Sequence, residues 1–250
     1  MVRSAETWLV SRAPRAAATV SLYCFPHTGG APGEYARWSD DLPGVRVRAL
    51  RPPGRGSRLY EPRFARMEEL VDAVVSAVTF ERPFVLLGHS LGALVAFEVA
   101  RLLRDRGKPP PERMIVSACP APRLIGPRPA PRHLLSDHEL LAEIERVSGP
   151  LPAEIRDDPQ LLANSLQAFR ADLEMLDTYI YRACDPFDYP ISAIAGADDE
   201  AGTRMPGWRD HTTRSFELRR FTGAHFYFRE CRHEVLSFLR HAIKDGENAG

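Results

Sequence analysis

Three separated positions carry the side chains that a serine nucleophile needs. Residues 88–92 fit the pattern G-x-S-x-G, with Ser90 at the centre. A serine hydroxyl attacks a carbonyl carbon only when a neighbouring base takes its proton, and the base needs an acid that orients its imidazole. Asp198 and Asp199 follow a later apolar run, and His225 follows the next one. This order predicts attack by Ser90, with His225 as the base and one of the two aspartates as the acid.

The segments around Ser90 favour this interpretation. Residues 84–87 form a short apolar run before the motif, and residues 91–106 form an amphipathic run after it. A strand followed at once by a helix needs a tight turn, in which flanking glycines leave room for an exposed serine. The alternatives are an ordinary glycine-rich turn in which Ser90 caps the helix, and a loop position without function for His225.

Acyl transfer also requires hydrogen-bond donors for the oxygen that becomes negative during the attack. The backbone N–H of Leu91, directly after the serine, is one candidate. Residues 25–30, F-P-H-T-G-G, follow the first predicted strand, and their glycines allow a backbone donor to approach a substrate. We expect the second donor in this loop. The alternative is a plain turn at the end of a strand.

These motifs need a scaffold that brings distant loops to one place. Short apolar runs alternate with longer amphipathic runs, which predicts an α/β fold with a mostly parallel central sheet flanked by helices. The carboxyl edge of such a sheet is where α/β proteins place their sites. The predicted strands are residues 20–25, 45–50, 84–87, 113–118, 191–195 and 215–221. The predicted helices are residues 34–42, 67–80, 91–106, 159–181 and 233–243.

A long interruption separates the fourth and fifth predicted strands. Residues 120–152 are rich in proline and are expected to be irregular or broken into short pieces, whereas residues 159–181 have apolar side chains at helical spacing. We interpret the interruption as a helical lid over the site; the alternative is one more helix that packs on the core. The expected organisation is a single domain of residues 1–250, with a core at about 19–120 and 186–245 and a lid insertion at about 121–185.

Composition excludes several classes of protein. The 33 basic and 33 acidic residues balance, so the strongly basic character of a nucleic-acid-binding domain is missing. We find no run of about 18 apolar residues that would suit a membrane span, and no apolar leader. The four cysteines are too far apart for a zinc motif or a disulfide framework: Cys24, Cys119, Cys184 and Cys231. We expect a reduced, cytoplasmic protein without a metal and without a membrane or nucleic-acid partner.

Taken together and in order, the motifs resemble the type II thioesterases that accompany polyketide and nonribosomal peptide synthetases. The resemblance extends from about residue 20 to residue 243, and its early motifs, FPxxGG and PGRG, are more specific than the serine pentapeptide. It rests on residues 25–30 (FPHTGG), 53–56 (PGRG), 88–92 (GHSLG), 196–199 (GADD) and 223–226 (GAHF).

The resemblance implies an α/β-hydrolase fold with a helical lid between the strands that the family numbers sixth and seventh. It assigns the nucleophile to Ser90, the base to His225 and the acid to Asp199, because the family's acid falls three residues after the glycine. It assigns the oxyanion donors to the backbone N–H groups of Thr28 and Leu91. Thr28 departs from the small alanine that is common at its position, and a backbone donor survives that change.

The resemblance also implies an editing enzyme. Such enzymes hydrolyse stalled or wrong acyl groups from the phosphopantetheine arm of acyl or peptidyl carrier proteins. Phosphopantetheine enters as part of the substrate, so no cofactor of the enzyme is expected. Candidate substrate contacts are His27, Arg55 and Phe169. Arg55 belongs to an arginine-rich stretch that would attract an acidic carrier protein or a phosphate, or would simply form a solvated surface. The stretch consists of Arg46, Arg48, Arg51, Arg55 and Arg58.

Three other readings remain open at this point. The alternative within the same fold is a carboxylesterase or lipase that acts on small esters. A second is a chain-terminating domain of a synthase, against which we note that no linker rich in proline and alanine precedes the domain. A third, from another class, is a non-catalytic binding module, which the intact set Ser90, Asp199 and His225 disfavours. We expect a monomer.

Overall fold

The computed structural model describes residues 5–13, 17–126 and 129–247, so the ends of the expected domain, residues 1–4 and 248–250, lie outside the described residues. Within the described ranges, seven strands form one sheet in the order β1-β3-β2-β4-β5-β6-β7. All neighbouring pairs are parallel except β1 and β3, which are antiparallel. The strands are β1 (Leu9–Val10), β2 (Val20–Phe25), β3 (Val45–Leu50), β4 (Phe84–His89), β5 (Arg113–Ser117), β6 (Ile191–Gly196) and β7 (Phe216–Phe221).

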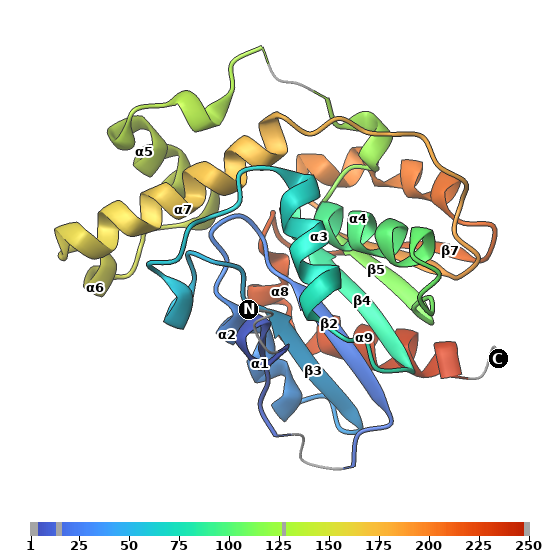
Figure 1. The fold of residues 1–250 in the computed structure, drawn as a ribbon. Helices are drawn as coiled ribbons and strands as arrows, with labels where there is room; N and C mark the ends of the chain where they lie inside the picture. The colour runs from blue at the N-terminus through green and yellow to red at the C-terminus, as the bar shows by residue number, and fades with distance from the viewer. Residues whose placement is uncertain (1–4, 14–16, 127–128, 248–250) are drawn as a thin grey trace.

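Helices cover both faces of this sheet. Strands β2, β4 and β5 are buried along their whole length, as expected for parallel strands enclosed on two sides. Helices α3 (Met67–Ala77) and α4 (Leu91–Asp105) lie on one face, and α9 (Arg232–Glu247) lies on the other (Figure 1).

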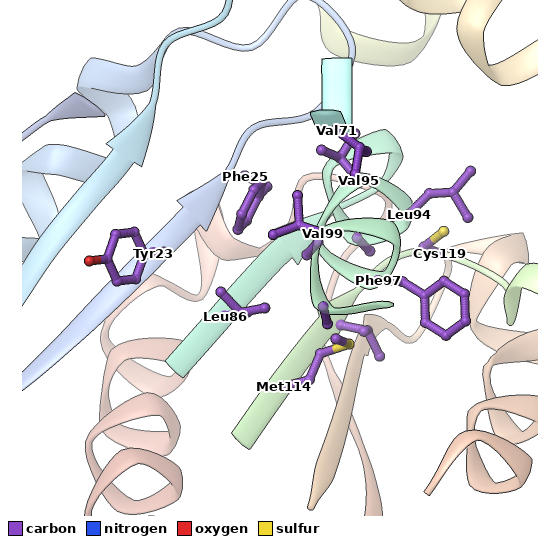
Figure 2. Packing of buried hydrophobic residues seen from close by; sticks show 14 of the residues in the cluster. Tyr23, Phe25, Val71, Leu86, Leu94, Val95, Phe97, Val99, Met114 and Cys119 are labelled. Carbon is purple, nitrogen blue, oxygen red and sulfur yellow. The ribbon is translucent and has the colours of Figure 1, made fainter. Parts of the chain in front are cut away.

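Each face has its own hydrophobic cluster. Figure 2 shows part of the first, in which Phe25 of β2 and Leu86 of β4 lie near Val99 of α4. Tyr23 of β2 belongs to the same cluster. The second lies beneath the short helix α2 (Pro32–Ala36), the 3-10 helix η1 (Arg37–Asp40), α8 (Tyr227–Glu230) and α9. Alternate residues of one strand therefore belong to different cores, which fixes the register of the sheet.

The predicted strands are found within two residues of their expected ends, and two differences concern short elements. Strand β1, which pairs Leu9 with Leu50, was not predicted, because two residues carry no alternation that a pattern could detect. The predicted helix at 34–42 is instead α2 followed by η1. The small helices α1 (Ala5–Trp8) and η2 (Gly56–Arg58) complete this half of the chain.

Residues 118–190, called the insertion below, connect β5 to β6, the fifth and sixth strands in chain order. Their three α-helices gather at one end of the molecule, away from α9 (Figure 1). They are α5 (Asp137–Ser148), α6 (Ala153–Arg156) and α7 (Pro159–Asp177), preceded by the 3-10 turns η3 (Pro122–Leu124) and η4 (Arg132–Leu134).

Residues 120–152 were expected to be irregular or broken into short pieces, and the 12-residue helix α5 is longer than that expectation. Ser136 and Glu139 form a capping box, in which Glu139 N–H donates to Ser136 Oγ and Ser136 N–H donates to the Glu139 carboxylate. Leu140 and Ile144 are then buried against Leu166 and Leu173 of α7 in a small cluster of their own. The prolines lie on both sides of this helix and none lies inside it.

Candidate active site

Ser90 lies in the sharp turn between β4 and α4. Its backbone has φ 55° and ψ −121°, a conformation that residues with side chains rarely adopt. The Ser90 N–H donates to the carbonyl of Ser117 at the end of β5, 2.8 Å away. A Cβ at Gly88 would lie 2.2 Å from the carbonyl oxygen of Gly92, and one at Gly92 would lie 1.9 Å from that of Phe25. The turn therefore closes only with glycine at both positions.

The residues expected to be the acid and the base meet in the loops after β6 and β7. His225 Nδ1 donates to Asp199 Oδ2 over 2.9 Å, since an ionised carboxylate only accepts. The other carboxylate oxygen of Asp199 accepts from the N–H of Ala201 at 3.0 Å, in the first turn of the 3-10 helix η5 (Glu200–His211). Asp198 is exposed, and its N–H donates to the carbonyl of Gly223. The structure thus pairs His225 with Asp199, which is the aspartate that the family pattern favours.

A close approach of backbones brings these two loops together. Strands β6 and β7 are adjacent and parallel, so the loops that follow them leave the same edge of the sheet. A Cβ at Gly196 would lie 2.2 Å from the carbonyl oxygen of Ala224, the residue before His225. Glycine at 196 therefore sets the distance between the loop of Asp199 and the loop of His225.

One cavity of about 610 Å³ joins the three loops. It is lined by Ser90, His225 and Asp199, and by both residues expected to supply the oxyanion donors, Thr28 and Leu91. Of the expected substrate contacts, His27 and Phe169 also line it, whereas Arg55 does not.

A comparison with known sequences identifies the family. The sequence model of the Thioesterase domain matches residues 20–243. The chain belongs to the thioesterase family.

The thioesterase is 38% identical over 234 residues to Thioesterase PikA5 of Streptomyces venezuelae, a match that covers 91% of this chain and 82% of PikA5. Among solved structures, RedJ, a thioesterase of the prodiginine pathway in Streptomyces coelicolor, superposes with a TM-score of 0.83 at 34% identity, covering 93% of this chain and 94% of RedJ. BorB, a type II thioesterase from the borrelidin biosynthetic cluster, superposes with a TM-score of 0.83 at 33% identity. The match covers 96% of this chain and 98% of BorB. The chain is therefore a thioester hydrolase with the α/β-hydrolase fold, similar to type II thioesterases.

In this thioesterase the insertion forms the apolar wall of the cavity. Phe169, Leu173 and Leu176 line it from α7. Leu162 and Leu166 of the same helix do not line it and pack in the small cluster with α5, to which Phe169 and Leu173 also belong. The insertion's other apolar lining residues, which sequence reasoning missed, are Ala118, Cys119, Pro120, Leu124, Ile125, Ile144 and Val147. The capping box and the apolar spacing after Ser136 were the signals that would have revealed the two on α5.

Two buried histidines lie beneath the thioesterase site. His27 Nδ1 and the hydroxyl of Tyr35 are 3.0 Å apart, and burial lowers the pKa of His27 to about 3. His89, directly before the serine, has its Nδ1 2.7 Å from Ser117 Oγ, and burial holds its pKa well below the usual value. Both imidazoles are therefore neutral at pH 7. His89 does not line the cavity, as expected from the geometry of the turn.

The arginine-rich stretch of the thioesterase finds partners within the protein. Arg46 and Arg48 pair with Glu81, and Arg58 pairs with Glu61. The remaining two members are Arg51, which donates to the carbonyl of Thr7, and Arg55, which pairs with Asp172. Arg55 and Arg58 are buried and so belong neither to a solvated surface nor to a docking patch, whereas Arg46 is exposed.

Across residues 5–13, 17–126 and 129–247 there is no group of three or more histidine, cysteine, aspartate or glutamate side chains arranged to hold a metal ion. In the same ranges, no helix has the length and apolar character needed to cross a membrane.

Proposed function

We propose that this thioesterase removes stalled or incorrect acyl groups from the phosphopantetheine arm of carrier proteins during polyketide or nonribosomal peptide synthesis. The type II thioesterase BorB and the pathway thioesterase RedJ support this substrate class. The observation that carries the mechanism is the His225–Asp199 hydrogen bond in the same cavity as Ser90.

In the proposed reaction, His225 Nε2 takes the proton of the Ser90 hydroxyl while Oγ attacks the thioester carbonyl carbon. Asp199 keeps the proton of His225 on Nδ1 and stabilises the imidazolium. The backbone N–H groups of Thr28 and Leu91 receive the oxyanion. Collapse of this intermediate releases the pantetheine thiol, which takes the proton from His225, and leaves an acyl ester on Ser90.

Water completes the proposed cycle. His225 takes a proton from a water molecule, the hydroxide attacks the acyl ester, and Ser90 leaves with the proton of the imidazolium. The products are the carboxylic acid and the free enzyme. No residue of this scheme calls for a cofactor, and phosphopantetheine takes part only as a portion of the substrate.

The insertion has a clear place in this proposal. We assign the acyl chain to the apolar wall formed by α5 and α7, because burying each methylene there is worth about 0.8 kcal/mol. Residues 121–185 then act as a lid on a single domain, with the core at 19–120 and 186–245. We further propose a cytoplasmic monomer that meets its carrier proteins in solution.

The first experiment measures acyl release from a loaded carrier protein by the wild type and by Ser90→Ala. We expect the variant to lose about 10³-fold or more in kcat, since the nucleophile is missing. Equal rates would overturn the assignment of Ser90. Wild-type activity restricted to simple esters would replace the carrier-protein substrate with the esterase alternative while keeping the triad.

A further inference from the structure

Asp172, on α7, makes two contacts outside the insertion through one carboxylate oxygen. Its Oδ2 accepts from the backbone N–H of Gly29, 2.8 Å away, and from the guanidinium of Arg55. The side chains of Arg55 and Asp172 are only 8% and 15% exposed. Bonds to a charged, poorly solvated acceptor are stronger than bonds between neutral groups. These contacts therefore hold α7 firmly against the loop after β2.

That loop contains the proposed oxyanion donor, Thr28 N–H. The Gly30 N–H donates to the carbonyl of His27 at 2.7 Å, which closes a tight turn. In a trans peptide the C=O and the N–H point in opposite directions, so this bond also sets the direction of Thr28 N–H. The N–H of Gly29, the next residue in the chain, donates to the Asp172 carboxylate. Both peptides of Thr28 are thus fixed, the first by the turn and the second by α7.

A second side chain of α7 fits the same place. Gly29 has φ +72°, and a Cβ added there would lie 2.0 Å from the ring of Phe169. Phe169 precedes Asp172 by almost one helical turn, so the two side chains lie on the same face of α7. The loop is therefore held from one side by an aromatic ring and by a carboxylate.

Charge explains why Arg55 belongs to this arrangement. A lone carboxylate next to Thr28 would repel the negative oxygen that forms during the attack. The Arg55 guanidinium neutralises that carboxylate while leaving it able to accept from Gly29. Arg55, expected as a substrate contact, pairs with Asp172 instead.

We propose that Asp172 is a positioning residue for the oxyanion hole, with Arg55 as the counter-charge that makes a carboxylate tolerable there. The inference rests on the proposed role of Thr28 N–H. It follows that the hole has its active geometry only while α7 is seated on the loop. The sequence offered no sign of this link, because Asp172 and Gly29 lie 143 residues apart.

The experiment uses Asp172→Asn, Asp172→Ala, Arg55→Met and the double variant of Arg55→Met with Asp172→Asn. Rates are measured on a butyryl thioester of N-acetylcysteamine. Affinity is measured for a trifluoromethyl ketone, which forms an oxyanion on Ser90, and for the matching methyl ketone, which does not. Arg63 also bonds to Asn164 of α7, so α7 keeps a second attachment in every variant.

We expect Asp172→Ala to lower kcat by about 10- to 100-fold with little change in KM, since a small misplacement of a donor costs this much. The trifluoromethyl ketone should lose affinity by the same factor, and the methyl ketone should not. Arg55→Met should also lower kcat, and adding Asp172→Asn should restore most of it by removing the uncompensated charge. The control Glu145→Ala breaks an exposed ion pair with Arg156 inside the insertion and should change nothing.

Two results would overturn the inference. One is wild-type kcat in Asp172→Ala together with an inactive Ser90→Ala, which leaves the proposed function intact. The other is a loss of melting temperature and activity with an unchanged preference for the trifluoromethyl ketone over the methyl ketone, which is the sign of a merely structural ion pair. Asp172→Leu has nearly the volume of the native side chain but no acceptor, and it provides the same comparison where Asp172→Ala folds poorly. Full activity in Ser90→Ala would instead remove the proposed mechanism and this inference together.

Discussion

Ser90, the proposed nucleophile, occupies a backbone conformation that costs free energy. A positive φ at a residue with a side chain costs about 1–3 kcal/mol, and Ser90 has φ 55°. The bond from its N–H to the Ser117 carbonyl and the glycines at 88 and 92 hold it there. The result is a hydroxyl presented in the cavity at the start of a helix.

Asp199 and Asp198 provide a matched pair of substitutions at the residue scale. Asp199→Asn should lower kcat by about 10³- to 10⁴-fold, because an amide in place of the carboxylate favours the wrong tautomer of His225. Asp198→Asn should stay near the wild-type rate, because its side chain is exposed and the bond to His225 comes from Asp199. Steady-state kinetics on one thioester compares both. A larger loss in Asp198→Asn than in Asp199→Asn would reverse the assignment of the acid.

At this scale the sequence predicts chemistry better than contacts. Ser90 and His225 were identified by their motifs and by the order of the strands before them. The two adjacent aspartates were equivalent until the family spacing was applied. The role of Asp172 depends on a fold that brings α7 over the loop after β2, and no local pattern encodes that contact.

Among the elements, helices α5 and α6 of the insertion bury far fewer residues than the core helix α4. The buried residues of α5 are Leu140 and Ile144, whereas α4 is buried over most of its length. Segments with few buried apolar contacts open at lower free energy than the core. The smaller number of buried residues in α5 supports the proposal that the insertion opens as a lid.

Hydrogen exchange tests the lid at the level of single helices. We expect the amides of α5 to exchange through openings several kcal/mol less costly than those of α4, which should require global unfolding. The part of α7 near Asp172 should be protected more than α5, because it is bonded to the loop after β2. Protection of α5 equal to that of α4 would contradict a mobile lid.

The elements differ in how accurately the sequence pattern predicts them. Long buried strands and α4 were predicted almost to the residue, because runs of apolar residues have no other stable place in a parallel sheet. Helix α5 was missed because the surrounding prolines dominated the local composition. The 3-10 helix η5 was not anticipated either, since it contains Pro206 and is held by tertiary contacts such as the burial of Trp208.

The molecule as a whole keeps several histidines buried and neutral. Burial lowers the pKa of His27 to about 3 and that of His211 to about 4, from about 6.5 in an unfolded chain. The unfolded state therefore binds more protons than the folded state between these values. The stability contributed by His211 is complete above about pH 6.5 and is lost as the pH falls toward about 4.

His211→Gln isolates this effect outside the cavity. The free energy of unfolding of the wild type should fall with decreasing pH more steeply than that of the variant between about pH 6 and 4.5, by about 1.4 kcal/mol per pH unit for one proton. Denaturant unfolding at several pH values measures both slopes. The control is His138→Gln, since His138 is exposed and meets water in both states. Equal slopes for the wild type and His211→Gln would contradict the assignment of a buried neutral imidazole.

The place of the insertion in the sheet also has a consequence for how the protein is made. Strand β5 pairs with β6, and residues 118–190 must be synthesised between them. Chains emerge from the ribosome with the N-terminal part first, so the serine and both proposed oxyanion donors exist well before their acid and base. Until β6 and β7 add to the edge of β5, the nascent protein has the proposed nucleophile without its proposed base. The proposed triad is therefore completed only when the last two strands of the sheet have formed.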